Sequence, residues 1–112
     1  MQVDTRKESS ISIVAIKGRM DAVTTPEIES KLTQLVNGGE KKLLVNLNDL
    51  EYISSAGLRA LLATAKRLKS EQGDIAFTNL GGHVKEVFEI SGFYSIFKVF
   101  ESTEAALEQF GK

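Results

Sequence analysis

The chain alternates between short apolar runs and longer segments in which apolar residues recur every three or four positions. Residues 11–16 are rich in β-branched side chains and stop at Gly18, which predicts a strand. Residues 3–7 alternate weakly and predict an edge strand beside it, joined by a turn near Ser9 and Ser10. Residues 43–47 are almost continuously apolar, which is typical of a central strand covered on both faces.

Helical periodicity marks four further segments. The first has Thr24 or Thr25 as its cap and Pro26 in its first turn, and Gly38 and Gly39 stop it. The second opens at Ser54 and Ser55 and ends before Gly73, and the last two cover residues 83–90 and 102–110. Two more strands are predicted at residues 75–78 and 96–100, whereas residues 50–53 form only a short connecting segment.

Two strands are thus followed by a helix and a strand in alternation, ending in a helix. This order favours an α/β fold with a mostly parallel mixed sheet of about five strands, packed with about four α-helices. With 112 residues and no repeat or linker, the chain suits one compact domain and is too short for two. We therefore expect a single domain over residues 1–112.

Composition and charge exclude several classes of function. The 14 basic and 15 acidic residues leave a net charge of −1, so the basic surplus of a nucleic-acid-binding protein is missing. The chain has no cysteine, and its one histidine, His83, cannot form a zinc site alone, so neither a metal nor a cofactor is expected. The start of the chain lacks the apolar stretch of a signal peptide, and no apolar run approaches the roughly 20 residues of a membrane span. We expect a cytoplasmic protein without membrane contact.

The segment richest in candidate chemistry is residues 49–62, which run from a predicted strand into an amphipathic helix. Ser54 and Ser55 lie at the junction, and the small residues Ala56 and Gly57 follow. The first amides of a helix have no internal partners and carry partial positive charge, so this place tolerates an anion, including a phosphate added to a serine. A serine before a helix is most often a plain N-cap, which is our interpretation of Ser54. For Ser55 the residues alone leave both roles open.

An enzyme is not expected. A serine nucleophile on a hydrolase elbow reads Gly-x-Ser-x-Gly, but this segment reads Tyr52-x-x-Ser55-x-Gly57 and lacks the first glycine. Only His83 offers an imidazole base, and it follows two glycines as a predicted surface residue. No catalytic residue is therefore assigned.

Three motifs resemble those of the bacterial STAS-domain anti-sigma factor antagonists. Residues 49–58 are similar to the family segment in which Asp-Ser-Ser-Gly-Leu or Asp-Ser-Ala-Gly-Leu follows the central strand. Residues 18–24 are similar to its Gly-x-Leu-Asp segment before the first helix, and residues 90–97 to its Ser-Gly-Leu stretch before the last strand. The resemblance covers essentially the whole chain and implies the STAS fold.

The resemblance also implies a partner switch. In that family a GHKL-type serine kinase, which is also an anti-sigma factor, phosphorylates the antagonist and releases it, and a serine phosphatase reverses the reaction. Aligned on Gly57 and Leu58, the phosphorylated serine of the family falls on Ser55. The chain would then bind the kinase while Ser55 is unphosphorylated and leave it once Ser55 is phosphorylated.

The same resemblance implies a partner-binding surface around Ser55, with acidic positions near it. Its members here are Asp21, Asp49, Ser54, Ser55, Gly57 and Arg59. Many family members have Asp directly before the phosphoserine, whereas this chain has Ser54, which makes Ser54 a second candidate acceptor. Without the resemblance, Asp21 and Asp49 are ordinary turn residues. Arg59 belongs to a basic helix face that is either simply solvated or able to steer an acidic partner.

Two alternatives stay open beside the switch. The chain can be an unphosphorylated STAS accessory subunit that uses the same surface for constitutive docking in a lipid-transport or signalling complex. A small hydrolase is the other alternative, and the missing base argues against it. A retained Ser55 permits phosphorylation in the switch and in the accessory subunit alike, so the residues do not separate these two.

Overall fold

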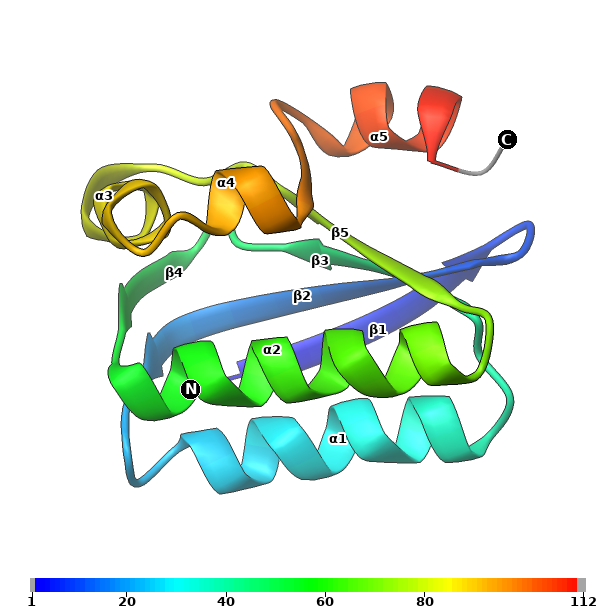
Figure 1. Ribbon diagram of the computed structural model, residues 1–112, viewed down its shortest axis with the longest axis horizontal. Coiled ribbons are helices and arrows are strands. Elements are labelled where there is room, and N and C mark those ends of the chain that lie inside the picture. Colours follow the sequence, from blue (N-terminus) through cyan, green and yellow to red (C-terminus); the bar gives the residue numbers. More distant parts are fainter. Residues whose placement is uncertain (1, 111–112) are drawn as a thin grey trace.

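The computed structural model describes residues 2–110, which form six strands and five helices (Figure 1). The strands are β1 (Gln2–Glu8), β2 (Ile11–Met20), β3 (Lys42–Asn46), β4 (Leu50–Ile53), β5 (Asp74–Thr78) and β6 (Lys98–Phe100). The helices are α1 (Thr25–Asn37), α2 (Ser55–Ser70), α3 (Gly82–Ile90), α4 (Phe93–Ile96) and α5 (Thr103–Gln109). No helix within residues 2–110 has both the length and the apolarity needed to cross a bilayer.

The strands build one mixed sheet in the order β1-β2-β3-β5-β6. Only β1 runs antiparallel to its neighbour, and β2, β3, β5 and β6 are parallel to one another. Strand β4 pairs in parallel with the last three residues of β2, beyond the part of β2 that pairs with β3. The predicted α/β architecture with a mostly parallel sheet is confirmed.

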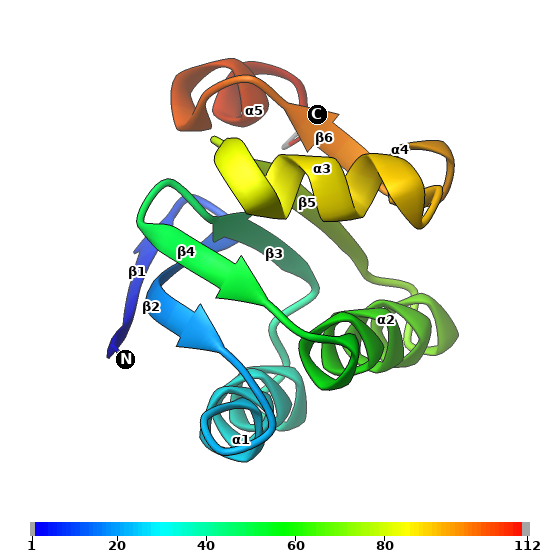
Figure 2. The ribbon, with the colours of Figure 1, turned by 90° about the vertical axis from the view of Figure 1, so that its left-hand side faces the viewer.

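Helices cover both faces of this sheet. Helices α1 and α2 lie side by side under one face, and α5 lies over the other (Figures 1 and 2). Because side chains alternate along a strand, Val14, Val45 and Phe77 enter the larger core with α1 and α2. Their neighbours Ile13 and Leu44 face α5 instead, in a smaller second core. Helix α3 packs against β4. The end of β2, the end of β4 and the start of α2 lie together at one corner of the molecule.

The structure departs from the sequence prediction at two places. Strand β2 continues through Gly18, which has φ of 99°, and reaches Met20 with a shift in register. This extension gives Leu50–Ile53 a partner, so the predicted connecting segment is a strand. Phe93–Ile96 forms a helical turn that was not predicted, so the last strand, expected from residue 96, begins at Lys98.

Candidate functional site

Ser54 lies between β4 and α2 and is the N-cap of the helix. Its backbone is extended, and its Oγ accepts a hydrogen bond from the amide of Gly57 at 3.2 Å. Its own amide donates to the carbonyl oxygen of Met20 at 2.8 Å. The first bond satisfies a free helical amide, and the second joins the start of α2 to the end of β2. Ser54 is therefore the structural cap that the sequence predicted.

Ser55 is the first residue of α2 and is exposed, whereas Ser54 is half-buried. Since Ser54 supplies the cap, the helix start does not depend on the Ser55 hydroxyl. The first turn of α2 contains no acidic residue, so no side chain within that turn offsets the positive end of the helix dipole. An anion attached to Ser55 would meet amides of the first turn and solvent.

Gly57 allows α2 to begin close against β2 and β4. A Cβ atom at this position would lie 2.8 Å from Cγ1 of Ile53 and 3.1 Å from Cβ of Met20. Both distances are shorter than normal contact between carbon atoms. The glycine therefore has a packing reason, and the close approach fixes where Ser55 emerges.

Asp21 follows Met20 directly, in the turn between β2 and α1. Its Oδ1 accepts hydrogen bonds from the amides of Val23 and Thr24, both at 3.0 Å. The bond from the Thr24 amide is the largest cause that lowers the pKa of Asp21 below its ordinary value of 3.8. Asp21 is thus an ionised carboxylate held in a fixed position. The residue before it, Met20, provides the carbonyl oxygen that accepts the hydrogen bond from the Ser54 amide.

The same turn corrects the predicted cap of α1. Thr24 occupies the N-cap position but its side chain makes no cap bond. Its Oγ1 donates to the carbonyl oxygen of Arg19 at 2.6 Å, and the amide of Thr25 donates to the carbonyl oxygen of Asp21 at 2.9 Å. The Asp21 turn, and not a threonine hydroxyl, starts the helix.

Asp49 does not lie beside Ser55, contrary to the expectation from the family resemblance. It is exposed at the beginning of β4, whereas Ser54 follows the end of that strand. The four residues of β4 lie between Asp49 and Ser54, so five extended steps place the two positions roughly 16 Å apart. Figure 2 shows the course of β4. The Asp49 carboxylate accepts a hydrogen bond from the side chain of Asn48, and its carbonyl oxygen accepts one from the amide of Gly18. Its role in this structure is in the turn before β4.

Arg59 is exposed one helical turn after Ser55, and residues four apart share a helix face. It lines a shallow hollow of about 380 Å³ between α1 and α2, with Ala56 and Pro26 among the walls. None of the ion pairs found among residues 2–110 includes Arg59. Of the predicted set, the structure gathers Asp21, Ser54, Ser55, Gly57 and Arg59 at one corner and leaves Asp49 outside.

A stack of three side chains beside this corner was not predicted. The guanidinium carbon of Arg19 lies 4.3 Å from the centre of the Tyr52 ring. The His83 imidazole is stacked on the same ring, with centroids 5.0 Å apart and planes 8° from parallel. Arg19 and Tyr52 are paired across β2 and β4, and that register depends on the irregularity at Gly18, which the sequence pattern does not signal.

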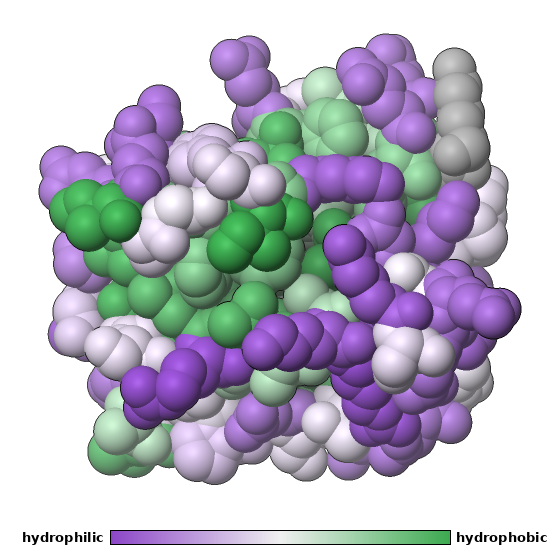
Figure 3. Space-filling model, viewed as in Figure 1, coloured by the Kyte–Doolittle hydropathy of each residue, from purple (hydrophilic) through white to green (hydrophobic). Residues whose placement is uncertain are grey.

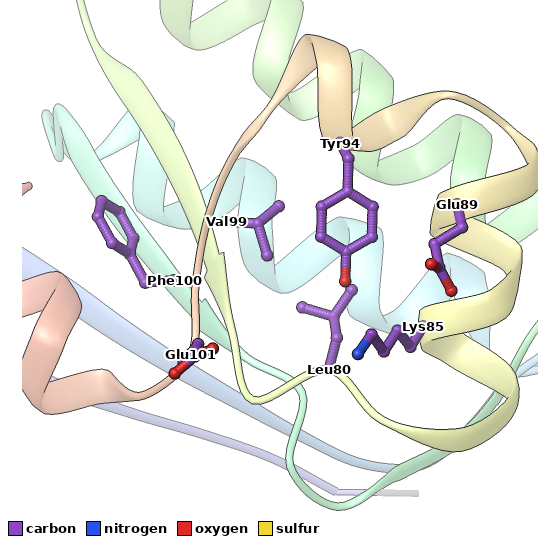
Figure 4. A pocket seen from close by; sticks show the side chains of 7 residues that line it. All are labelled: Leu80, Lys85, Glu89, Tyr94, Val99, Phe100 and Glu101. Carbon is purple, nitrogen blue, oxygen red and sulfur yellow. The ribbon is translucent and has the colours of Figure 1, made fainter.

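Apart from the hollow beside Arg59, the corner at Ser55 is open surface. Apolar surface extends between α2 and the α3–α4 segment, where Ile90 is 86% and Ile96 55% exposed (Figure 3). A hollow larger than the one beside Arg59, of about 580 Å³, lies between α3, α4 and β6 and includes none of the predicted site residues (Figure 4). Within residues 2–110 no group of three or more His, Asp or Glu side chains is placed to hold a metal ion. The candidate site suits a macromolecular partner better than an enclosed small substrate.

A family model and a similar protein of known sequence point to the same family. The family model described as the STAS domain matches residues 2–106. The chain is 41% identical over 110 residues to BtrV of Bordetella bronchiseptica, whose name describes it as an anti-sigma factor antagonist. The alignment covers 98% of this chain and 95% of BtrV.

Solved structures agree on the fold. A Thermotoga maritima protein described as an anti-sigma factor antagonist superimposes with a TM-score of 0.93, at 18% identity, over 98% of this chain and 95% of its own. The phosphorylated form of the Bacillus cell fate determinant SpoIIAA superimposes with a TM-score of 0.76, at 17% identity, over 97% of this chain and 99% of its own. At these identities the likeness is one of fold.

Proposed function

Since the chain belongs to the STAS-domain family of anti-sigma factor antagonists, we propose that it is a phosphorylation-controlled partner switch. While Ser55 is unphosphorylated, the chain binds a GHKL-type serine kinase that also acts as an anti-sigma factor. Phosphorylation of Ser55 releases that kinase, and a serine phosphatase restores the binding form. The protein works in the cytoplasm, as a binding module and not as an enzyme.

The observation that carries this proposal is that two adjacent serines have different structural roles. Ser54 is half-buried and holds the helix through its cap bond to the Gly57 amide. Ser55 is exposed, and α2 starts without using its hydroxyl. A kinase can therefore modify Ser55 without dismantling the helix start. Modification of Ser54 would remove an N-cap, at a cost of about 1 kcal/mol.

The surroundings of Ser55 also suit a phosphate. The helix dipole favours a negative charge at this end, by roughly 0.3–1 kcal/mol at an exposed site. Arg59 lies one turn further along the same face and can pair with a phosphate. Asp21 lies across the corner as a fixed negative charge, so the phosphate is drawn toward the helix amides and Arg59. The fold is compatible with such a state, because SpoIIAA shares it and has been solved in both its unphosphorylated and phosphorylated forms.

Mapping of the acceptor tests the proposal. Wild-type protein and the Ser55→Ala and Ser54→Ala variants are incubated with the cognate GHKL-type kinase and ATP, and intact mass and fragment spectra are recorded. Wild type and Ser54→Ala should gain one phosphate, located on Ser55, and Ser55→Ala should gain none. If Ser55→Ala is phosphorylated as fully as wild type, the assignment is wrong. If no variant is modified, the unphosphorylated accessory subunit becomes the better description.

A further inference from the structure

A cleft of about 360 Å³ lies at the opposite end of α2 from Ser55, between that helix and the α4–β6 segment. We call it the basic cleft. Its apolar walls come from Leu62, Ile75 and Ile96, and its rim carries Lys66, Lys69 and Lys98. Its volume falls within the usual range for a binding pocket, roughly 300–1,000 Å³. Figure 3 shows the apolar surface between α2 and α4 with long polar side chains along its border.

The charge around the basic cleft is one-sided, although the whole chain is almost neutral. Lys98 forms an ion pair with Asp74, the one acidic residue in the lining. Lys66 and Lys69 take part in none of the ion pairs found among residues 2–110. Three lysines against one aspartate leave a local charge of +2, whereas the chain as a whole carries −1. The cleft therefore attracts an acidic partner.

The apolar part of the cleft is also incompletely covered. Ile75 and Phe97 are only 3% and 8% exposed, but Ile96 beside them is 55% exposed. A large apolar side chain inserted there would remove Ile96 from water, a gain that grows with the area covered. The concave shape favours a protruding side chain of a protein over a lipid surface, to which a membrane-binding protein presents protruding apolar residues of its own.

We infer that the basic cleft is a second docking site, which binds an acidic segment of a protein partner carrying a large apolar side chain. The apolar side chain fills the space beside Ile96, and carboxylates on either side of it pair with Lys66 and Lys69. Lys66 follows Ser55 by eleven helical steps, about 16 Å along the axis. A partner in this cleft therefore leaves Ser55 accessible, and its binding does not depend on the phosphate. The inference stands apart from the proposed function, because it uses none of the residues around Ser55.

The hollow on the other side of α4 provides an internal comparison. It is larger, but Lys85 on its rim is matched by Glu89 and Glu101 (Figure 4). One lysine against two glutamates gives a local charge of −1. An acidic segment should therefore enter the basic cleft and avoid this hollow. Lys85 and the exposed Ile90 are matched control positions outside the basic cleft.

A selection with random peptides tests the inference and does not require that the partner be identified first. A display library of random 16-residue peptides is selected on the wild-type protein, after depletion on the triple variant Lys66→Glu, Lys69→Glu, Ile96→Asp. Far-ultraviolet circular dichroism establishes that the variant is folded. If the triple variant is unfolded, Lys66→Glu, Lys69→Glu replaces it, since both lysines are exposed. The recovered peptides are then synthesised and their affinities measured against wild type, the depletion variant and the control Lys85→Glu, Ile90→Asp.

The expected peptides contain one large apolar residue flanked by Asp or Glu. They should bind at least tenfold more weakly to the depletion variant, bind the control and Ser55→Asp as tightly as wild type, and lose affinity as salt is raised. Peptides without acidic residues, equal affinity for the depletion variant, or failure to recover any peptide would each overturn the inference. Binding of the wild-type protein, but not of the depletion variant, to phosphatidylserine vesicles would also overturn it and assign the cleft to membranes.

Discussion

Helices α2 and α5 begin with the same local device but present different surfaces. In each, a serine caps the helix by accepting a hydrogen bond from the amide three residues later, from Gly57 to Ser54 at 3.2 Å and from Ala105 to Ser102 at 3.1 Å. The next hydroxyl is buried in α5, where Thr103 lies close to Thr78 and Asn79. In α2 the corresponding Ser55 is exposed.

The two first turns also differ in charge and packing. Helix α5 has Glu104 in its first turn, whereas α2 has no acidic residue there. Gly57 of α2 is packed tightly against β2 and β4, and the equivalent position in α5 is Ala105. The comparison separates what holds a helix start from what makes it available for signalling. Capping is common to both, and only α2 combines it with an exposed hydroxyl, an unneutralised dipole and a tightly fixed position.

The largest difference in stability between matched variants is expected at the third residue of each helix, Gly57 in α2 and Ala105 in α5. Gly57→Ala should destabilise the protein by about 1–3 kcal/mol, because the new Cβ overlaps Ile53 and Met20. Helix propensity alone predicts the opposite, since alanine is the better helix former. The reverse change in α5, Ala105→Gly, should cost no more than about 1 kcal/mol. Urea denaturation of both variants measures the difference, and a stabilised Gly57→Ala would refute the packing argument.

The two caps should be equivalent. Ser54→Ala and Ser102→Ala each remove one bond to a helical amide, so each should lower the free energy of unfolding by about 1 kcal/mol. Thermal and urea denaturation of the two variants provide the measurement. A loss confined to one of them would show that the shared geometry does not reflect a shared contribution to stability.

Removing the hydroxyl that follows each cap should destabilise the protein more in α5, where it is buried, than in α2, where it is exposed. Thr103→Val removes a buried hydroxyl whose neighbours are polar, with an expected loss of about 0.5–1.5 kcal/mol. Ser55→Ala should change stability by less than about 0.5 kcal/mol, because the residue is exposed and outside the cap. A Ser55→Ala variant that is as destabilised as Thr103→Val would mean that the fold does use this hydroxyl.

The smallest expected effect is on the pH dependence of stability, through Asp21 near the start of α2. The folded-state pKa of Asp21 is lowered, chiefly by the Thr24 amide, so its contribution to stability is present above the ordinary pKa of 3.8 and disappears as pH falls through the lower folded value. Asp21→Asn keeps the acceptor oxygen and removes the charge. Its stability should therefore fall less on acidification below about pH 4 than that of wild type. Identical acid profiles would show that Asp21 does not contribute. Glu40, whose pKa is lowered by the Ser12 hydroxyl and by Lys7, contributes acid sensitivity in wild type and variant alike.

The sequence predicts most of this arrangement, for physical reasons that are local. Periodicity and caps locate β2, α1, α2 and α5, and the serine pair at the start of α2 is visible as a helix-start signal. The short elements are missed, because Leu50–Ile53 is a strand only through its partner in β2, and Phe93–Ile96 is a single turn.

The site is predicted less completely than the fold, because it depends on how elements pair. Ser54 and Ser55 are neighbours in the chain, and one turn of helix separates Arg59 from them, so local geometry is sufficient. Asp49 is close to them in sequence but lies at the other end of an extended strand. The stack of Tyr52 with Arg19 and His83 requires a register that the bulge at Gly18 sets.

The central claim, that the exposed hydroxyl of Ser55 controls partner binding, is tested most directly by the affinity for the anti-sigma kinase. Titration calorimetry compares wild type, Ser55→Ala, Ser55→Asp and the control Ser30→Asp, which places the same charge on an exposed position of α1. Ser55→Ala should lose at most one hydrogen bond, about 0.5–1.5 kcal/mol. Ser55→Asp should bind more weakly than Ser55→Ala, because the added charge loses its hydration when the interface covers it, and Ser30→Asp should bind like wild type. Equal affinities of Ser55→Asp and wild type would contradict the account.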